Sequence, residues 1–110
     1  MKRQLDRKPH VPRSDQETIR HGIAAILRRQ AMSALEISAE LHIPERDVYP
    51  HLEHIRLSLH ASGELLHVTP AECRRCGFVF AKRGRLTSPS RCPLCRCEGI
   101  FPPLFAIGEP

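Results

Sequence analysis

Apolar residues recur every three or four positions between residues 19 and 27, which is the spacing of one face of an α-helix. Ser14 and Glu17 stand three residues apart just before this run, the spacing of a capping box at a helix start. We therefore expect a helix over residues 14–30, with its arginines on the solvent side. The buried face of this helix is expected to comprise Ile19, Ile23, Ile26 and Leu27.

A second pair with the capping spacing, Ser33 and Glu36, opens a shorter stretch that indicates a second helix. Pro44 then interrupts the pattern, and proline is favoured in the first turn of a new helix. A third helix is expected beyond it, because four apolar residues share one helical face there: Val48, Leu52, Ile55 and Leu59.

Shorter apolar runs follow the third helix. Gly63 ends the helical pattern, and residues 64–68 have the composition of a strand. Residues 78–80 and 100–107 provide two more strand segments, the latter interrupted by two prolines. We expect an α+β chain in which three helices precede a small three-stranded ribbon. The expected divisions are a basic flexible arm over residues 1–14, a helical domain over residues 15–68 and a ribbon domain over residues 69–110.

Four cysteines fall into two close pairs, Cys73 with Cys76 and Cys92 with Cys95. Two intervening residues let one tight turn aim both sulfurs of a pair at the same point, and two pairs supply the four thiolates of a tetrahedral zinc site. Because four cysteines fill the coordination shell, we expect one structural zinc ion per chain and no catalytic metal. Iron in a rubredoxin-like site is the competing interpretation, and Cys97 is expected to be a free thiol.

Composition narrows the class of protein. The 110-residue chain contains five cysteines, all after residue 72, and no charged-then-apolar leader, so a secreted disulfide framework fits poorly and a cytoplasmic protein is expected. No apolar run approaches the roughly 20 residues that a membrane helix requires, so we expect a soluble protein with no membrane partner. No nucleophile and base pair, phosphate-cradling glycine loop or paired-carboxylate motif occurs, so we expect no enzymatic activity.

The net charge of +5 is unevenly distributed. Residues 1–14 carry five basic residues against one acidic residue, residues 15–68 carry five against eight, and residues 69–110 carry seven against three. The arm and the ribbon are therefore basic, and the helical segment between them is acidic. Two interpretations of the arm stay open: a solubilising tail, or a segment that neutralises DNA phosphates.

Residues 36–52 resemble the recognition unit of bacterial and archaeal winged-helix repressors, with small residues on the second helix and apolar Ile43 after the turn. Together with the cysteine-containing residues 70–80 and 89–95 and the terminal residues 100–107, they are similar to a family of small predicted transcriptional regulators. In that family a winged helix-turn-helix is fused directly to a zinc ribbon, and the resemblance covers about residues 15–107. It implies transcription regulation by binding to double-stranded DNA, with a homodimer as one option. A plain three-helix unit is the alternative.

DNA contacts are expected from the third helix and from the ribbon. Arg46 and Tyr49 are the candidates on the third helix, because the resemblance places recognition there and an arginine can make a forked contact with guanine. Glu45 and Glu53 on the same helix would repel phosphates, so we expect most phosphate contacts from the arm and the ribbon. The ribbon candidates are Arg74, Arg75, Lys82, Arg83, Arg85 and Arg91.

Other functions stay open. The acidic helical segment also fits a non-enzymatic protein-interaction adaptor that uses the helical domain and the ribbon as docking surfaces. Electron transfer by an iron-loaded ribbon is a third hypothesis. A histidine metal sensor, indicated by the spacing of His51 and His54, lacks a third ligand fixed by sequence, so packing or hydrogen bonding is the expected role of His51, which is next to Leu52.

Overall fold

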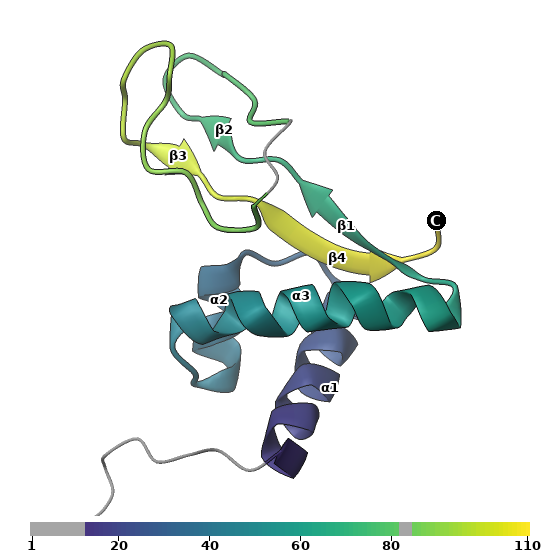
Figure 1. Ribbon diagram of the computed structural model, residues 1–110. Helices are drawn as coiled ribbons and strands as arrows, with labels where there is room; N and C mark the ends of the chain where they lie inside the picture. Colours follow the sequence, from purple (N-terminus) through teal and green to yellow (C-terminus); the bar gives the residue numbers. More distant parts are fainter. Residues whose placement is uncertain (1–12, 82–84) are drawn as a thin grey trace, which may run out of the picture.

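A computed structural model describes residues 13–81 and 85–110, so nearly all of the predicted basic arm lies outside the described residues. Three helices come first and four short strands follow, giving the mixed α+β fold that the sequence predicts. Within the described part of the chain, no helix combines the length and the apolar character needed to cross a bilayer. The elements in Figure 1 are α1 (Arg13–Arg29), α2 (Ala34–Leu41), α3 (Glu45–Ser62), β1 (Leu65–Thr69), β2 (Glu72–Cys73), β3 (Ile100–Phe101) and β4 (Leu104–Gly108).

The helix starts agree with the sequence in one case and differ in two. α2 has the predicted capping box, because the Ser33 hydroxyl accepts the Glu36 N–H at 3.2 Å and the Glu36 carboxylate accepts the Ser33 N–H at 2.9 Å. α1 begins one residue earlier than predicted, so Ser14 lies within its first turn. Pro44 precedes α3 as its N-cap and does not lie within the first turn. Extended backbone before a helix suits proline, whose φ is fixed.

The buried faces of the helices are largely the predicted ones. All four expected residues of α3 are buried, and in α1 Ile19 alone of the four is only partly buried. On α2, Ile37 is fully buried while Leu35 is 62% exposed. α3 ends at Gly63, whose φ of 76° lies in the left-handed region that glycine adopts without a steric penalty.

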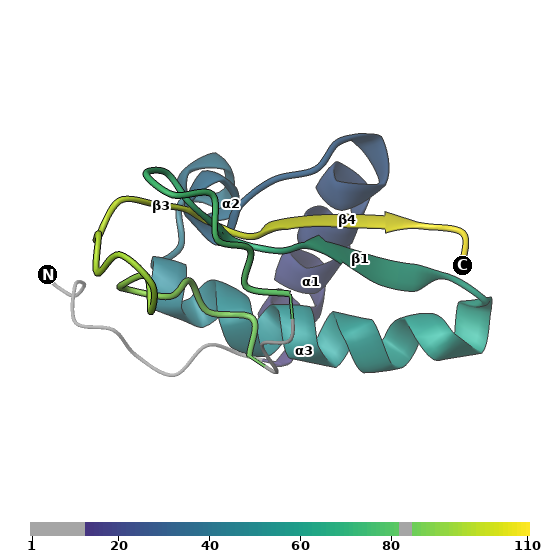
Figure 2. The ribbon, with the colours of Figure 1, turned by 90° about the horizontal axis from the view of Figure 1, so that it is seen from above.

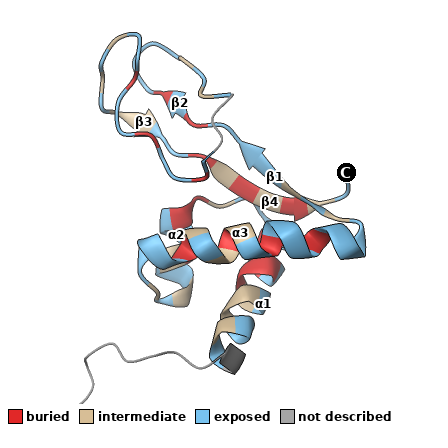
Figure 3. Ribbon diagram, in the orientation of Figure 1, coloured by how far each residue is buried: buried red, intermediate tan, exposed pale blue. Residues whose placement is uncertain are grey.

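The strand that follows α3 pairs with the end of the chain. β1 and β4 are antiparallel, with the register running from Leu65 opposite Gly108 to Thr69 opposite Leu104. A single bridge adds Met32, in the α1–α2 connection, to the other edge of β4: its N–H and C=O bond to the C=O and N–H of Phe105 at 3.0 and 2.8 Å. Figure 2 shows β4 passing over α1, and Figure 3 shows buried residues along β4.

The ribbon is inserted between β1 and β4, over residues 70–103. The predicted three-stranded sheet is wrong, because the described residues form two two-stranded sheets, β1 with β4 and β2 with β3. The predicted strand over residues 78–80 is reduced to one bridge between Val79 and Glu72, since the tight cysteine turns leave few residues for pairing. Two prolines divide the predicted strand over residues 100–107 into β3 and β4, which pair with different partners.

The apolar core lies between the three helices and the β1–β4 sheet. Phe105 and Ile107 of β4 belong to this core with Ile23, Leu27 and Leu52 of the helices. One residue from the middle of the ribbon, Leu86, also reaches it. The helical unit, defined here as α1, α2, α3, β1 and β4, is therefore completed by residues on both sides of the inserted ribbon.

Candidate metal centre and nucleic-acid interface

The four paired cysteines come together in space. Their sulfurs all lie within 4.8 Å of one another, and the Sγ atoms of Cys73 and Cys95, and of Cys76 and Cys92, are 3.5 Å apart. Sulfurs around a tetrahedral zinc ion, with Zn–S distances of about 2.3 Å, stand roughly 3.8 Å apart. A disulfide would require about 2.05 Å. The spacing of the sulfurs therefore fits one bound metal ion and excludes disulfides between these pairs.

Backbone amides converge on the sulfurs from the tight turns that hold them. The N–H groups of Arg75 and Cys76 donate to the sulfur of Cys73 at 3.3 and 3.5 Å, and that of Leu94 donates to the sulfur of Cys92 at 3.4 Å. Donors aimed at sulfur favour the thiolate, which is the form that binds a metal. The two cysteine turns thus provide both the ligands and the dipoles that stabilise their charge.

Each turn ends in left-handed backbone. Gly77, directly after the first pair, has a φ of 80°, and Arg96, directly after the second, has a φ of 64°. Glycine adopts this conformation freely, whereas a residue with a Cβ atom is strained in it. The sequence predicts a turn at Gly77. At the equivalent position of the second turn, the left-handed conformation is adopted by Arg96, where glycine would be less strained.

The pKa values of the thiols diverge. The pKa of Cys73 falls to about 6, chiefly because the Cys76 N–H bonds to its sulfur and further because the Arg75 N–H does the same. At Cys95 the hydrogen bond from the Cys97 N–H lowers the pKa. Burial and the neighbouring thiols outweigh it and raise the pKa of Cys95 to about 12. Sulfurs this close share their remaining protons, and a divalent cation would displace those protons and compensate the negative charge of four thiolates.

Both halves of the chain match family models. Residues 18–67 match the model described as PF0610-like, N-terminal, and residues 70–109 match the PF0610 rubredoxin-like zinc beta-ribbon domain. The chain is thus similar to a PF0610-like N-terminal domain over its first half and to a zinc ribbon over its second half. It is similar to the solution NMR structure of protein PF0610 from Pyrococcus furiosus, with 27% identity, a TM-score of 0.72 and coverage of 96% of this chain and 100% of that chain. No curated protein matches the chain.

These matches and the geometry of the sulfurs assign one structural zinc site to the chain. Cys73 and Cys92 are buried, Cys95 is half-buried and Cys76 is exposed, so the site lies just beneath the surface of the ribbon. Cys97 is not among the four clustered sulfurs. Its sulfur accepts the Gly99 N–H at 3.2 Å, which agrees with the expectation of a free thiol beside the site.

Some of the arginines expected to contact DNA are exposed and unpaired among the described residues, and others contact another side chain of the ribbon. Arg46, Arg75 and Arg85 are exposed, and none of them forms a salt bridge with a described residue. Arg91 pairs with Glu98 at 3.0 Å, and the Arg74 guanidinium lies over the ring of Phe101, 4.7 Å from its centre. Lys82 and Arg83 lie outside the described residues.

Tyr49 links α3 to the ribbon. Its hydroxyl donates to a Glu45 carboxylate oxygen at 3.1 Å and accepts the backbone N–H of Ser88 in the ribbon. Burial, followed by the bond to Glu45, raises the pKa of Tyr49 to about 12. The sequence predicts Tyr49 as a DNA contact, whereas in the structure its hydroxyl lies at the contact between the two parts of the chain.

The histidines of α3 face an arginine. Arg20 of α1 donates through Nε to Nδ1 of His51 at 3.2 Å, and its Nη1 lies 3.5 Å from Nε2 of His54. Burial, and then the charge of Arg20, lower the pKa of His51. Among the described residues, the four cysteines are the only group of metal-binding side chains. Hydrogen bonding, one of the two roles expected of His51, is found in its contact with Arg20.

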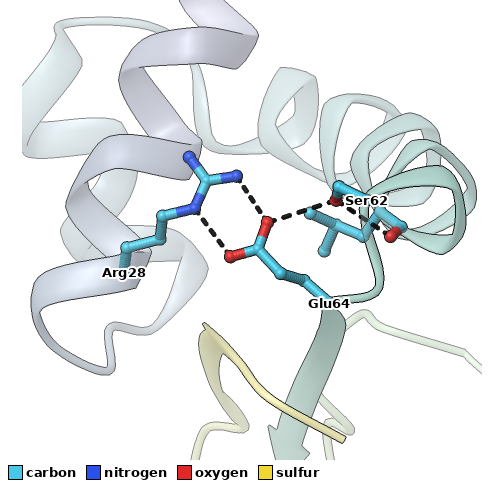
Figure 4. Close-up of polar contacts among 4 residues, drawn as sticks. Arg28, Ser62 and Glu64 are labelled. Atoms are coloured by element: carbon cyan, nitrogen blue, oxygen red, sulfur yellow. Dashed lines mark hydrogen bonds and ion pairs between the residues drawn. The ribbon is translucent and has the colours of Figure 1, made fainter.

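Two arginines have surroundings that the sequence does not reveal. Arg28 of α1, expected on the solvent side, forms a two-pronged contact with Glu64 at 2.8 and 3.0 Å, and Ser62 also donates to this carboxylate (Figure 4). Arg56 of α3, which was not among the candidate DNA contacts, pairs with Glu53 and lines a pocket against the ribbon. No local motif identifies the Arg28–Glu64 contact or the pocket beside Arg56, because the residues that form them come from distant parts of the chain. Glu53, in contrast, is a neighbour of Arg56 on the same helix.

Proposed function

We propose that this protein is a DNA-binding transcriptional regulator in which a winged helix-turn-helix docks on duplex DNA. The observation that carries this proposal is the order of the helical unit: α2, a tight turn and α3, followed by the β1–β4 hairpin packed against the helices. In a winged helix, the recognition helix is followed by such a hairpin. Here the ribbon occupies the connection of the hairpin, where the loop of a wing would stand (Figure 1).

Because of its charges, α3 is expected to contribute only a small part of the affinity for DNA. Arg46 is exposed near the start of α3, but Glu45, Asp47 and Glu53 stand on the same helix. A helix with this balance gains little from phosphates, which supply most of the affinity in protein–DNA complexes. Arg75 and Arg85 of the ribbon and the basic residues of the arm are therefore proposed as the main phosphate contacts.

The metal has a structural role in this proposal. Four sulfurs leave no open coordination position for a substrate or a reactive water, so we propose no catalytic activity. Thiols held as metal ligands, and not as disulfides, suit a cytoplasmic regulator.

Titration of a random-sequence duplex with the zinc-loaded protein at 50 and 200 mM salt tests the proposal. Each phosphate contact adds about 0.9 to the slope of log affinity against log salt, so several contacts would weaken binding at least tenfold between these conditions. Arg75→Met and Arg85→Met should each lower the slope by about one. An absence of binding at the lower salt concentration would rule out the proposal.

A protein-interaction adaptor is the second candidate. It is favoured by apolar side chains that the ribbon exposes, Leu94 at 71% and Phe101 at 49%, together with the acidic residues of α3. Such a surface would dock on a basic partner. The two candidates differ in their response to Arg75→Met and Arg85→Met, which should weaken DNA binding and leave binding to a basic protein unchanged or tighter. Association of two copies, measured by sedimentation, tests the homodimer expected for a regulator.

A further inference from the structure

A pocket of about 190 Å³ lies at the junction of the helical unit and the ribbon. Arg56 of α3 and Val68 of β1 line it from one side, and Phe80, Arg85 and Leu86 of the ribbon line it from the other. We call it the junction pocket. Because the ribbon is inserted between β1 and β4, neither part of the chain forms this pocket alone.

The junction pocket has a positive lining. Arg56 and Arg85 are its charged side chains, and no carboxylate is among the described residues that line it. Glu53 binds one terminal nitrogen of Arg56, which leaves the other N–H donors of that guanidinium free of described carboxylates. Arg85 is exposed and forms no salt bridge with a described residue. Two guanidinium groups from different elements, of which only Arg56 is paired with a described carboxylate, leave a net positive charge that favours an anion.

The remaining walls are apolar and partly aromatic. Phe80 is half-buried, and the edge-to-face contact of its ring with that of Phe78, at 4.9 Å between centres and 87°, restricts its orientation. Val68 is 40% exposed, so apolar surface remains accessible beside the arginines. A free inorganic anion would leave these walls in contact with water. The lining instead suits a ligand that joins an anionic group to a flat apolar ring.

An unpaired nucleotide has this combination of groups, with a phosphate beside a base whose face stacks on aromatic side chains. In duplex DNA the bases are stacked on one another and cannot enter a pocket without leaving the helix. The pocket is formed in part by Arg56 of α3, and the Tyr49 contact with Ser88 joins the ribbon to the first half of this helix. A strand leaving a duplex bound at α3 would therefore reach it.

We infer that the junction pocket binds one unpaired nucleotide of a DNA strand, with the base against Phe80 and Val68 and the phosphate between Arg56 and Arg85. This inference rests on the proposed function, since it identifies the kind of DNA the regulator prefers. A duplex with a short single-stranded overhang is the expected target, and a blunt duplex is expected to bind more weakly.

The test compares fluorescence anisotropy of a blunt duplex and of the same duplex with a three-nucleotide overhang, using the full zinc-loaded chain. The overhang should tighten binding by roughly fivefold to a hundredfold, the effect of stacking one base on an aromatic side chain. Arg85→Met and Phe80→Leu should abolish this preference. Arg75→Met is the matched control, because Arg75 is an exposed ribbon arginine that does not line the pocket. The ratio of the affinities for the overhang and blunt duplexes should be the same in this variant as in the wild-type chain. Zinc content and helical circular dichroism establish that each variant is folded.

The outcomes separate the two ideas. Equal binding of both duplexes by the wild-type chain would overturn the inference and leave the proposed regulator intact. A preference for the overhang that survives in both Arg85→Met and Phe80→Leu would place the unpaired strand elsewhere and would also overturn it. Binding of neither duplex at low salt would reject the proposed function together with the inference.

Discussion

In the helical unit, residues from α1, α2, α3 and β4 form a continuous buried apolar cluster in which Ile23, Leu52 and Phe105 are fully enclosed. The ribbon has few buried apolar side chains among its described residues. Apart from Leu86, which joins the helical cluster, its buried residues are two cysteines of the metal site with Ala71, Pro89 and Pro103. Phe101 is half-exposed and Leu94 is largely exposed. The ribbon therefore depends on metal ligation where the helical unit depends on apolar burial.

The insertion of the ribbon makes this difference easy to examine. β1 and β4 are held by their own hydrogen bonds and by the packing of Phe105 and Ile107 against the helices. A disordered ribbon would be a long loop between two paired strands, and closing a longer loop adds little free energy. Loss of the ribbon structure should therefore leave the helical unit folded, while damage to the helical core should affect the whole chain.

Metal removal should have the largest effect. A chelator, or the substitution Cys92→Ser, should unfold the ribbon, because metal binding contributes on the order of 10 kcal/mol to folding in small zinc domains. Amide resonances of residues 71–101 should collapse to unfolded positions while the helical circular dichroism is largely retained. The loaded protein should be colourless and contain one equivalent of zinc, since an iron site would be coloured. Loss of the helical signal on chelation would show that the two parts fold as one.

Truncation of the core should come next. Phe105→Ala should lower the free energy of unfolding by about 3–5 kcal/mol, the usual result of removing a fully buried phenylalanine ring. Urea unfolding followed at 222 nm, with zinc present, measures this change. Phe101→Ala is the matched control, because it deletes the same ring from a half-exposed position in the ribbon. Similar losses in the two variants would contradict the distinction between the apolar core and the ribbon.

The sequence predicts those features whose partners are close in the chain. The Ser33–Glu36 capping box, the buried face of α3 and the two cysteine pairs each depend on spacings of three to eleven residues, and all are found in the structure. Local spacing determines which way a side chain points on a helix or in a tight turn. It does not determine which strand a segment will join.

Long-range pairings account for the errors. The sequence predicts β4 as a strand of the ribbon, but Phe105 packs in the helical core and pairs with Val68 and Met32, both more than 30 residues away. The contacts of Tyr49 with Ser88 and of Arg28 with Glu64 likewise join distant segments. None of these has a periodic signal, because register between remote segments depends on how the whole core packs. The junction pocket could be found only from the folded chain, because Arg56 and Arg85 come from distant segments.

A smaller effect is expected at the two cysteine turns, and it should be confined to the ribbon. Gly77→Ala should destabilise the metal-bound ribbon by about 1–2 kcal/mol, because φ at this position is 80°. No atom of a described residue lies close to an added Cβ, so the cost comes from the backbone conformation and not from a clash. Arg96→Gly should stabilise the second turn by up to about 1 kcal/mol, since Arg96 now has the unfavourable left-handed backbone. Competition with a coloured chelator gives the zinc affinity of each variant. Changes of the same sign would contradict the shared turn geometry.

The smallest effect is expected at the Arg28–Glu64 pair, which joins the end of α1 to the residue before β1 (Figure 4). The hydrogen bond from Arg28 lowers the pKa of Glu64 below its ordinary value of 4.5. A lowered folded-state pKa means that the pair stabilises the chain fully above pH 4.5 and loses this contribution as the pH falls through the folded value. A double-mutant cycle of Arg28→Met and Glu64→Gln, measured by urea unfolding, should give a small coupling at pH 7 that decreases as the pH is lowered below 4.5.

The neighbouring residue provides the control for this pair. Arg29 is exposed and forms no salt bridge with a described residue, so Arg29→Met combined with Glu64→Gln should show no coupling at pH 7 or at lower pH. Because Arg28 and Glu64 both lie in the helical unit, their coupling at pH 7 should survive removal of zinc. A coupling that disappears with the metal would mean that the ribbon holds the end of α1 against the start of β1, and that the apolar core does not suffice to position them.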